Sequence, residues 1–286
     1  MSGNDVWRPG LPSNTDPAPW PPKRKINPAV PHPVRMYDYM LGGKDNFEAD
    51  RKAAEELMAI SPAARAGVQD NRDFLSRAVR HLSELGVTQF LDIGAGLPSH
   101  GNVHEIAQAV HPTARVVYVD NDPMVMAHAR ALRTSTSPEG KVAHVETDVR
   151  DPEAILSHPG LRATLDFDRP IALLLLAMLS FVQDADEPHK LVRHLLDALP
   201  SGSYLVLSHL CSDLIPPPAV QAITDVYAKT SAPITIRSRT EILQFFDGTE
   251  LIEPGLVKVF LWHPEEHEHR GPDDITGLYA GVGRKP

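Results

Sequence analysis

The sequence predicts an α/β fold in which helices cover both faces of a mostly parallel β-sheet. Short apolar segments rich in Val, Ile, Leu and Tyr alternate five times with helix-length segments, and they mostly lack the polar alternation of a half-exposed strand. Strands of this kind are buried on both faces and are joined by right-handed crossovers. The expected strands are 89–93, 115–120, 142–146, 171–176 and 204–207.

Helix start signals stand between the expected strands. Asn102, followed three residues later by Glu105, resembles a capping box, in which each side chain accepts a hydrogen bond from the other residue's backbone N–H. An acidic residue before proline is a second start signal, because proline fits the first helical turn. It occurs at Asp122-Pro123 and Asp151-Pro152.

The two ends of the domain depart from this alternation. Two amphipathic helices are expected before the first strand, one starting after Asp45 and one ending at Gly86. After the fifth strand, a helix is expected near 240–246. Residues 256–262 and 278–283 follow as two β segments without a long helix between them, which predicts an antiparallel pair at one sheet edge.

Residues 1–33 differ in composition from the rest of the chain. They hold nine of the 27 prolines and lack apolar periodicity, so we expect a flexible tail. Two tryptophans and the basic run 23–25 leave partner docking by this tail as an alternative. There is no internal repeat or second set of strands, so residues 34–286 are expected to form one domain with a helical cap at 34–86.

Composition narrows the range of partners. Lys and Arg number 28 against 37 Asp and Glu, a net charge of −9, which argues against binding nucleic acid or an anionic membrane. The longest apolar run, 171–179, is shorter than the roughly 18 residues needed to cross a bilayer. Cys211 is the single cysteine and no signal segment opens the chain, so we expect a cytoplasmic protein in which Cys211 is a buried apolar residue.

The residues after the first expected strand point to a cofactor site. In an open parallel sheet, ligands bind outside the C-terminal strand ends, where this chain places Asp92, Gly94 and Gly96. Glycines let a ligand approach the backbone closely. A dinucleotide site prefers a third glycine where Ser99 stands. Asp92 would repel a diphosphate but attract a positively charged sulfonium cofactor with an amino-acid tail.

Two further carboxylates follow the next two strands. Asp120 ends the second strand, where an acidic residue accepts hydrogen bonds from both ribose hydroxyls, while Asp122 is assigned to helix capping. Asp148 follows the third strand and can accept from an adenine amino group, with the backbone N–H of Val149 facing the ring. Three successive strand ends therefore offer partners for one nucleoside.

With these residues the chain resembles a class I S-adenosylmethionine (SAM)-dependent methyltransferase, with 92–96 as the first motif, Asp120 as the ribose acid and Asp148 as the adenine acid. The resemblance implies SAM as cofactor and a Rossmann-like, mostly parallel seven-stranded sheet of order 3-2-1-4-5-7-6 with an antiparallel last strand. The cofactor contacts are expected at Asp92, Gly94, Ala95, Gly96, Asp120, Asn121, Asp148, Val149 and Ala177.

Four segments resemble a narrower family of bacterial S-adenosyl methyltransferases that was first catalogued as a domain of unknown function. The most specific is 36–47 (MYDYMLGGKDNF), because it is not a generic methyltransferase feature. The others are 90–94, 117–123 and 245–248. The resemblance extends from about residue 34 to the C-terminus and does not identify the methyl acceptor.

The Gly-Gly-Lys part of segment 36–47 is not a phosphate-binding P-loop. Asp38 replaces the expected first glycine, and Asp45 replaces the Ser or Thr expected after Lys44. A tight turn leading to a helix capped near Asp45 is one explanation. Because N-terminal segments commonly close over the cofactor in this fold class, we also expect Tyr37, Lys44 or Asn46 to contact cofactor or acceptor.

No general base is evident near the position of methyl transfer. Ser180 follows the fourth strand, where relatives often carry histidine, and a serine without a partner is not a base at neutral pH. His209 and Tyr37 are the remaining catalytic candidates, with a packed structural histidine as the alternative for His209. Transfer from a sulfonium gains mainly from alignment and desolvation, so the chemistry does not require a base.

No metal site is expected. Residues 104–108 resemble the start of a zinc-binding H-E-x-x-H motif, but Gln108 stands where the second histidine must be. The segment 263–269 is rich in His and Glu, yet it lies between two β segments and is interpreted as a solvated loop.

The sequence therefore predicts a SAM-dependent methyltransferase that acts on a small-molecule or other non-nucleic acceptor. Two alternatives stay open. An NAD(P)-dependent oxidoreductase is disfavoured by Ser99 and Asp92, whereas a non-catalytic SAM-binding regulator is favoured by Ser180 and the missing base. The acceptor, the attacked atom and the oligomeric state are not indicated.

Overall fold

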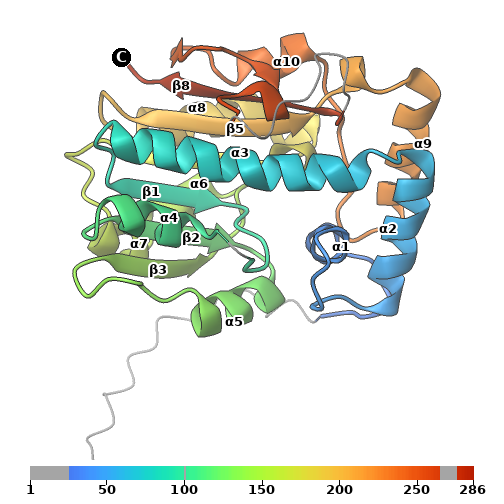
Figure 1. The fold of residues 1–286 in the computed structure, drawn as a ribbon, viewed down its shortest axis with the longest axis horizontal. Helices are drawn as coiled ribbons and strands as arrows, with labels where there is room; N and C mark the ends of the chain where they lie inside the picture. Colours follow the sequence, from blue (N-terminus) through green and yellow to red (C-terminus); the bar gives the residue numbers. More distant parts are fainter. Residues whose placement is uncertain (1–25, 100, 265–275) are drawn as a thin grey trace, which may run out of the picture.

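The computed structural model describes residues 26–99, 101–264 and 276–286. The predicted tail up to residue 25 and the later part of the His-rich segment lie outside these described residues. A β-sheet forms the centre of the molecule, helices cover both of its faces, and further helices lie across one end of the strands (Figure 1).

Within the described residues, the sheet has eight strands in the order β3-β2-β1-β4-β5-β8-β6, with β7 also paired to β8. β1 to β5 are parallel, and β8 is antiparallel to β5, β6 and β7. The expected mostly parallel order is confirmed, but the described sheet has one strand more than the predicted seven, because two short strands stand in the place of the sixth and β8 in the place of the seventh. The strands are β1 (Gln89–Ile93), β2 (Arg115–Asp120), β3 (Lys141–Glu146), β4 (Ala172–Leu176), β5 (Tyr204–Leu210), β6 (Glu250–Leu251), β7 (Val257–Lys258) and β8 (Leu278–Arg284).

The predicted strand 256–262 is wrong beyond Lys258. Val259–Leu261 forms the short 3₁₀ helix η4, because its backbone turns toward α3 (Ala64–Glu84). The buried Arg77 of α3 holds this turn, donating from Nη2 to the Val259 carbonyl at 3.0 Å and from Nε to the Trp262 carbonyl at 2.9 Å. Alternation of apolar residues could not reveal this distant guanidinium.

Successive residues of each central strand enter different cores, as the period of two requires. In β1, Phe90 packs with α3 and α4 (Val103–Val110), whereas Leu91 packs on the opposite face with α6 (Pro152–Ser157), α7 (Pro159–Thr164), α8 (Pro188–Asp197) and α10 (Arg239–Gln244). β2, β4 and β5 divide in the same way. Burial on both faces explains why these strands read as near-continuous apolar runs.

Most of the predicted helix starts are confirmed. Asn102 and Glu105 form a capping box at α4, and Asp122 accepts from two backbone N–H groups at the start of α5 (Pro123–Leu132). Asp151 caps α6. The helix expected after Asp45 is α2 (Glu48–Ile60), but its N-cap is Phe47 and not Asp45; the Phe47 N–H donates to the Asp50 carboxylate of the first turn at 2.8 Å.

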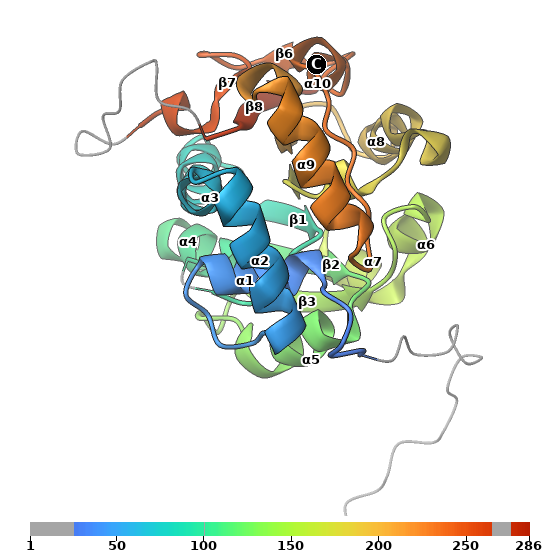
Figure 2. The same ribbon diagram turned by 90° about the vertical axis from the view of Figure 1, so that its right-hand side faces the viewer.

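A helical cap lies across the C-terminal ends of the parallel strands. It consists of α1 (Pro33–Met40), α2, the start of α3 and α9 (Pro217–Ala228), which cross in front of the strands in Figure 2. These helices share a third apolar core, separate from the two cores on the sheet faces. No sequence pattern singled out α1 or α9. The short helices η1 (Leu179–Phe181), η2 (Asp184–Asp186) and η3 (Ser212–Leu214) complete the connections.

Part of the predicted tail packs against this cap. The guanidinium of Arg35 donates to the carbonyls of Asn27 and Val30, and its Nε lies 2.8 Å from the buried Asp50 carboxylate. The Pro31 carbonyl accepts from the N–H of Ser231. Described residues before Val34 are therefore joined to the folded domain.

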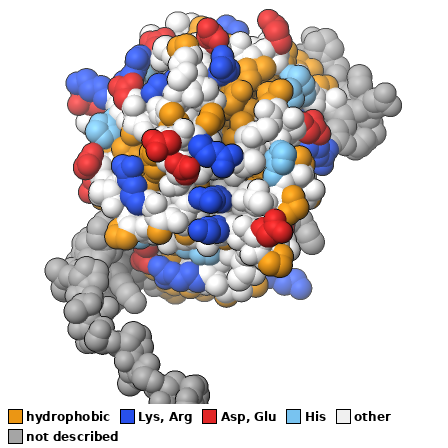
Figure 3. Space-filling model, turned by 90° about the vertical axis from the view of Figure 1, so that its left-hand side faces the viewer, with side chains coloured by type: hydrophobic (Ala, Val, Ile, Leu, Met, Phe, Trp, Pro, Cys, Tyr) orange, Lys and Arg blue, Asp and Glu red, His pale blue; other side chains and the backbone are white. Residues whose placement is uncertain are grey.

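The face opposite the cap differs from the strand ends that the cap covers. In Figure 3, acidic and basic side chains are intermixed over this face with apolar ones between them. Such mixing is ordinary for a surface facing water. Within the described ranges, no helix is both long enough and apolar enough to span a bilayer.

Candidate functional site

One large cavity lies between the cap and the strand ends. Its volume of about 1280 Å³ exceeds the roughly 300–1,000 Å³ of ordinary small-molecule sites. We call the part lined by the strand-end segments 92–99, 119–123, 147–150 and 177–178 the cofactor half. The cap half is lined by α1, the α2–α3 junction, residues 210–234 and residues 276–278.

The glycine turn after β1 forms the floor of the cofactor half. Gly94 and Gly96 have φ values of +76° and +63°, which non-glycine residues rarely adopt. A Cβ on Gly94 would lie 2.7 Å from the Cβ of Met178, whereas a Cβ on Gly96 would have no atom within 4 Å. Gly94 therefore permits close packing of two loops, and Gly96 leaves space beside the backbone.

Asp92 and Asp120 are buried carboxyls on this floor. Burial raises the pKa of Asp92 to about 6, against the lowering effect of Arg133 and Arg72. Burial likewise raises the pKa of Asp120 to about 6, although its oxygens accept from the N–H groups of Asp122 at 2.9 Å and Gly96 at 3.0 Å. Each carboxylate oxygen has two lone pairs, so Asp120 can accept further hydrogen bonds from a ligand.

Asp148 is already strongly hydrogen-bonded. Its carboxylate accepts from the Asn121 amide at 2.8 Å and from the Arg150 guanidinium at 2.8 and 2.6 Å. Burial alone would raise the pKa of Asp148, but these hydrogen bonds outweigh it and hold the pKa at about 2. Asp148 is thus a charged acceptor, and Arg150 is a lining residue that the sequence did not single out.

Two hydroxyls and a guanidinium that the sequence did not assign to ligand contacts also line the cofactor half. Ser99 Oγ and Thr147 Oγ1 are buried and have no hydrogen-bond partner among the residues that the structure describes. Arg72 reaches the glycine turn from α3 and donates to the Gly101 carbonyl at 3.0 Å. Buried polar groups are normally paired, so these hydroxyls suit a polar ligand. Only tertiary packing brings Arg72 here.

A chain of hydrogen bonds connects the cap to the strand end after β4. Tyr37 Oη accepts from the Asn71 amide at 3.1 Å, and Asn71 Oδ1 accepts from Ser208 Oγ at 2.5 Å. Ser208 Oγ in turn accepts from the N–H of Ala177 at 2.9 Å. Ala177 has a φ of +53°, an uncommon conformation for a residue with a Cβ. The chain therefore holds a strained backbone at the junction of the two halves.

The three candidates from the N-terminal segment lie in different places. Tyr37 and Lys44 line the cavity. Burial raises the pKa of Tyr37, and its hydroxyl donates to the Val68 carbonyl, so this phenol is not a base at neutral pH. Asn46 is not brought to the cavity wall. Its amide donates to Asp38 and to the Gly43 carbonyl, which makes it a support of the turn.

His209 is a packed histidine rather than a residue of the cavity wall. Its Nδ1 lies 2.7 Å from the Leu210 carbonyl and 3.3 Å from Ser180 Oγ, and its Nε2 accepts from Arg237 at 3.0 Å. Burial lowers the pKa of His209 to about 4, so the ring is neutral near pH 7. With both nitrogens engaged, His209 is not placed to receive a proton from a bound acceptor, while Ser180 does line the cavity.

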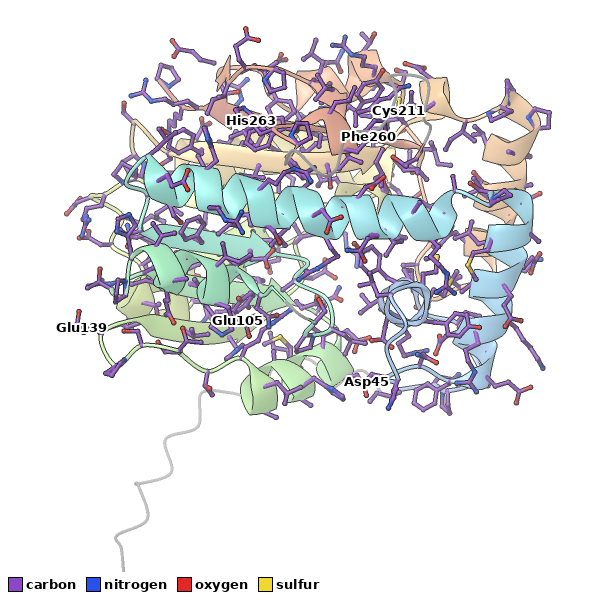
Figure 4. The ribbon with its side chains drawn as sticks, in the orientation of Figure 1. Asp45, Glu105, Glu139, Cys211, Phe260 and His263 are labelled. Carbon is purple, nitrogen blue, oxygen red and sulfur yellow. The ribbon has the colours of Figure 1, made fainter. Side chains whose placement is uncertain are left out.

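Two histidine–carboxylate contacts join the cap to α5 beside the cavity. His32 Nε2 lies 3.2 Å from Asp122 Oδ2, and Asp45 Oδ2 lies 3.3 Å from His128 Nδ1. Figure 4 labels Asp45 on the loop after α1, where this loop faces α5. These contacts explain why Asp45, expected to cap α2, instead bridges two parts of the molecule.

In the described part of the chain, no cluster of three or more His, Cys, Asp or Glu side chains could hold a metal ion. Cys211 is buried as expected, and burial raises the pKa of its thiol to about 11. The Cys211 thiol is therefore protonated near neutral pH.

The cofactor half fits a nucleoside that carries a positive charge and an amino-acid tail. Asp120 and Asp148 offer acceptors for hydroxyl and amino groups, and Asp92 offers negative charge. Arg72, Ser99 and the open space beside Gly96 suit a carboxylate. This fit rests on buried polar groups and on glycine positions where a side chain would occupy the space of the cofactor half.

Comparison with known proteins agrees with this fit. Residues 20–286 match the model of a family described as S-adenosyl methyltransferase. No curated protein sequence matches the chain.

Three solved structures share the fold. A DUF574 family protein from Streptomyces avermitilis is 46% identical over 90% of this chain and 98% of its own, with a TM-score of 0.86. A putative methyltransferase from Thermobifida fusca is 42% identical over 90% and 96%, with a TM-score of 0.81. The plantazolicin methyltransferase BamL, solved with S-adenosylhomocysteine (SAH), is 11% identical over 88% and 95%, with a TM-score of 0.51, a likeness of fold alone.

Proposed function

The chain belongs to the S-adenosyl methyltransferase family, and we propose that it moves the methyl group of SAM to a small-molecule or other non-nucleic acceptor bound in the cap half. Family membership answers the alternatives that the sequence left open. The protein is a SAM-dependent methyltransferase, not an NAD(P)-dependent oxidoreductase or a non-catalytic regulator.

The strand-end residues hold SAM in this proposal. Asp120 accepts the ribose hydroxyls, which are donors of suitable strength for a buried carboxylate. Asp148 and the Val149 backbone face the adenine. One oxygen of the Asp148 carboxylate then accepts from the adenine amino group in place of Arg150. Arg72 and Ser99 face the methionine carboxylate, and Gly94, Ala95 and Gly96 form the floor beneath the tail.

The chemistry divides between cofactor and protein. When bound, SAM supplies a methyl group on positively charged sulfur, and the electron pair of the broken C–S bond stays on sulfur. The chain's residues orient this group and exclude water, because Ala177 and its hydrogen-bond chain to Tyr37 form a rigid boundary between the two halves. Neither His209 nor Tyr37 is placed to accept a proton, so a proton lost by the acceptor leaves with the methylated product and passes to bulk solvent after transfer.

One observation carries the proposal: a single cavity joins the strand-end carboxyls to an apolar space under the cap. The negative net charge supports a non-nucleic acceptor, since a polyanion would be repelled. A small acceptor fits because the second space lies inside the fold.

The test is a methyl-transfer assay with SAM labelled in its methyl group and a bacterial extract. The extract is separated into small-molecule, protein and nucleic-acid fractions. We expect label in the small-molecule fraction, at least about tenfold less with Asp120→Asn, and no change with Asp151→Asn, in which asparagine still caps α6. Label confined to nucleic acid would refute the proposal.

A further inference from the structure

The cap half of the cavity is built from the third apolar core. Side chains that belong to this core and also line the cavity include Leu57, Val68, Phe181, Ile215, Ile223 and Ile234. They come from α2, α3, η1, α9 and the segments beside them, and α2 and α9 cross the strand ends in Figure 2. The space that an acceptor would enter is therefore bounded by aliphatic and aromatic carbon.

Charge is distributed unevenly around the cavity. Its charged lining side chains come from α1 and the following loop, from Arg72 of α3, and from the ends of β1, β2 and β3. The lining residues of segments 210–234 and 276–278 are uncharged without exception among those that the structure describes. An ionised acceptor group on this wall would lose its hydration without gaining a partner.

The hydroxyl of Thr276 is a buried polar group of this wall. Thr276 lines the cavity and is only 7% exposed. Its Oγ1 has no hydrogen-bond partner among the described residues. A buried hydroxyl is normally hydrogen-bonded, and a ligand hydroxyl or carbonyl would satisfy it. The wall thus combines an apolar surface with neutral hydroxyls, and the Thr276 hydroxyl is the buried one among them that lacks a partner in the described part of the chain.

We propose that the methyl acceptor is an uncharged, largely apolar small molecule with one hydroxyl or carbonyl group that pairs with Thr276. The inference rests on the proposed function, because it assumes that the cofactor half holds SAM. It excludes acceptors that present an ammonium, carboxylate or phosphate to the wall formed by segments 210–234 and 276–278. It also predicts that affinity follows apolar area rather than charge.

The test uses three bicyclic probes of similar size that differ in charge. 2-Naphthol is neutral at pH 7.5, 2-naphthoate is an anion and 2-naphthylmethylamine is a cation. Binding to the full chain is followed by probe fluorescence in the presence of saturating SAH. We expect 2-naphthol to bind at least about tenfold more tightly than either ion, a difference of about 1.4 kcal/mol. Equal or tighter binding of an ion, or no binding of 2-naphthol, would overturn the inference.

Two variants locate the probe. Ile223→Asp places a carboxylate in the apolar wall and should weaken 2-naphthol binding at least about tenfold. Leu243→Asp is the matched control, because Leu243 is exposed on α10 outside the cavity lining. It should leave 2-naphthol binding unchanged. Equal affinity in both variants would place the probe elsewhere and refute the assignment.

Thr276→Val tests the polar contact without adding charge or much volume. It should weaken 2-naphthol binding roughly two- to tenfold, the range for one hydrogen bond, and leave naphthalene binding unchanged. A loss of both would indicate altered packing and count against the role of the hydroxyl.

Calorimetry with SAH separates the two levels of the account. A folded chain that binds SAH but not 2-naphthol would refute this inference and leave the proposed function standing. A folded chain that does not bind SAH would refute the proposed function itself.

Discussion

The two halves of the cavity are built in different ways. In the cofactor half, the polar groups follow three successive strands, at Asp92, Asp120 and Asp148. In the cap half, Tyr37 near one end of the chain and Thr276 near the other line the same cavity. The chemistry of the first half is therefore local in sequence, whereas that of the second depends on how distant segments pack. Substitutions in the two halves should have separable effects on cofactor and acceptor.

The largest effect is expected for Gly94→Ala in the cofactor half. The new Cβ would lie 2.7 Å from Met178 Cβ at a φ of +76°. Left-handed strain costs about 1–2 kcal/mol and overpacking about 1–3 kcal/mol. SAH affinity, measured by calorimetry, should fall at least about a hundredfold.

Gly86→Ala is the matched control for Gly94→Ala. Gly86 follows α3 with a φ of +91°, but a Cβ there has no neighbour within 4 Å. It should cost about 1–2 kcal/mol of unfolding free energy from backbone strain alone and leave SAH affinity unchanged. Equal loss of affinity in both variants would show that strain, and not the shape of the cofactor half, explains the result.

The next largest effect is expected for Asp120→Asn. The variant removes one charge and one of the acceptors that hold the N–H groups of Gly96 and Asp122. We expect SAH affinity to fall about 10- to 100-fold, since hydrogen bonds to a charged group contribute roughly 1.5–3 kcal/mol. Calorimetry measures the SAH affinity of this variant and of the control Asp151→Asn. A change below about twofold in Asp120→Asn would contradict the ribose role of Asp120.

Cofactor affinity should depend on pH through the same carboxyl. Burial raises the pKa of Asp120 to about 6 from 3.8, so a proton must leave before the carboxylate can accept both ribose hydroxyls. SAH affinity should be about tenfold lower at pH 5 than at pH 7 and level above pH 7. A flat profile in calorimetric titrations between pH 5 and 7 would contradict this coupling.

The same raised pKa values should make the free energy of unfolding change with pH in the direction opposite to SAH affinity. The folded chain without ligand binds protons at Asp92 and Asp120 more tightly than the unfolded chain, because both pKa values exceed the ordinary 3.8. The contribution of these two groups to stability is therefore present below about pH 4 and is lost as pH rises through 6. SAH should offset this loss, which chemical unfolding at pH 5 and pH 7 with and without SAH would reveal.

The smallest effect is expected in the hydrogen-bond chain between the halves. Ser208→Ala leaves Asn71 Oδ1 without its donor and should cost about 1–2 kcal/mol of unfolding free energy. Combined with Tyr37→Phe, it should show a coupling of at least about 0.5 kcal/mol. Combined with Ser238→Ala, which removes the distant cap of α10, the costs should add. Additive costs in both pairs would show that the chain does not act as a unit.

Local patterns predicted the cofactor half and its sheet. β1 and β2 have the predicted bounds, because continuous apolar runs bounded by turns identify strands that are buried on both faces. Asp92, Asp120 and Asp148 meet in one cavity because parallel strands end at the same sheet edge. Asp122 caps α5 as expected from its proline neighbour.

The cap and its contacts could not be predicted in the same way. α9 begins with consecutive prolines and packs against α2, so its role depends on a distant helix. Arg72 and Thr276 carry no local signal, and Asn46 looked functional although it supports a turn. The segment 259–261 had the composition of a strand, but Arg77 turns it into a 3₁₀ helix. Tertiary partners decide each of these cases.

A crystal structure of the full chain with SAH bound tests the central claim most directly. The account predicts ribose hydroxyls within about 2.5–3.0 Å of the Asp120 carboxylate, and the sulfur atom near Ala177 facing the cap half. SAH bound outside this cavity, or with its sulfur facing away from the cap half, would contradict it.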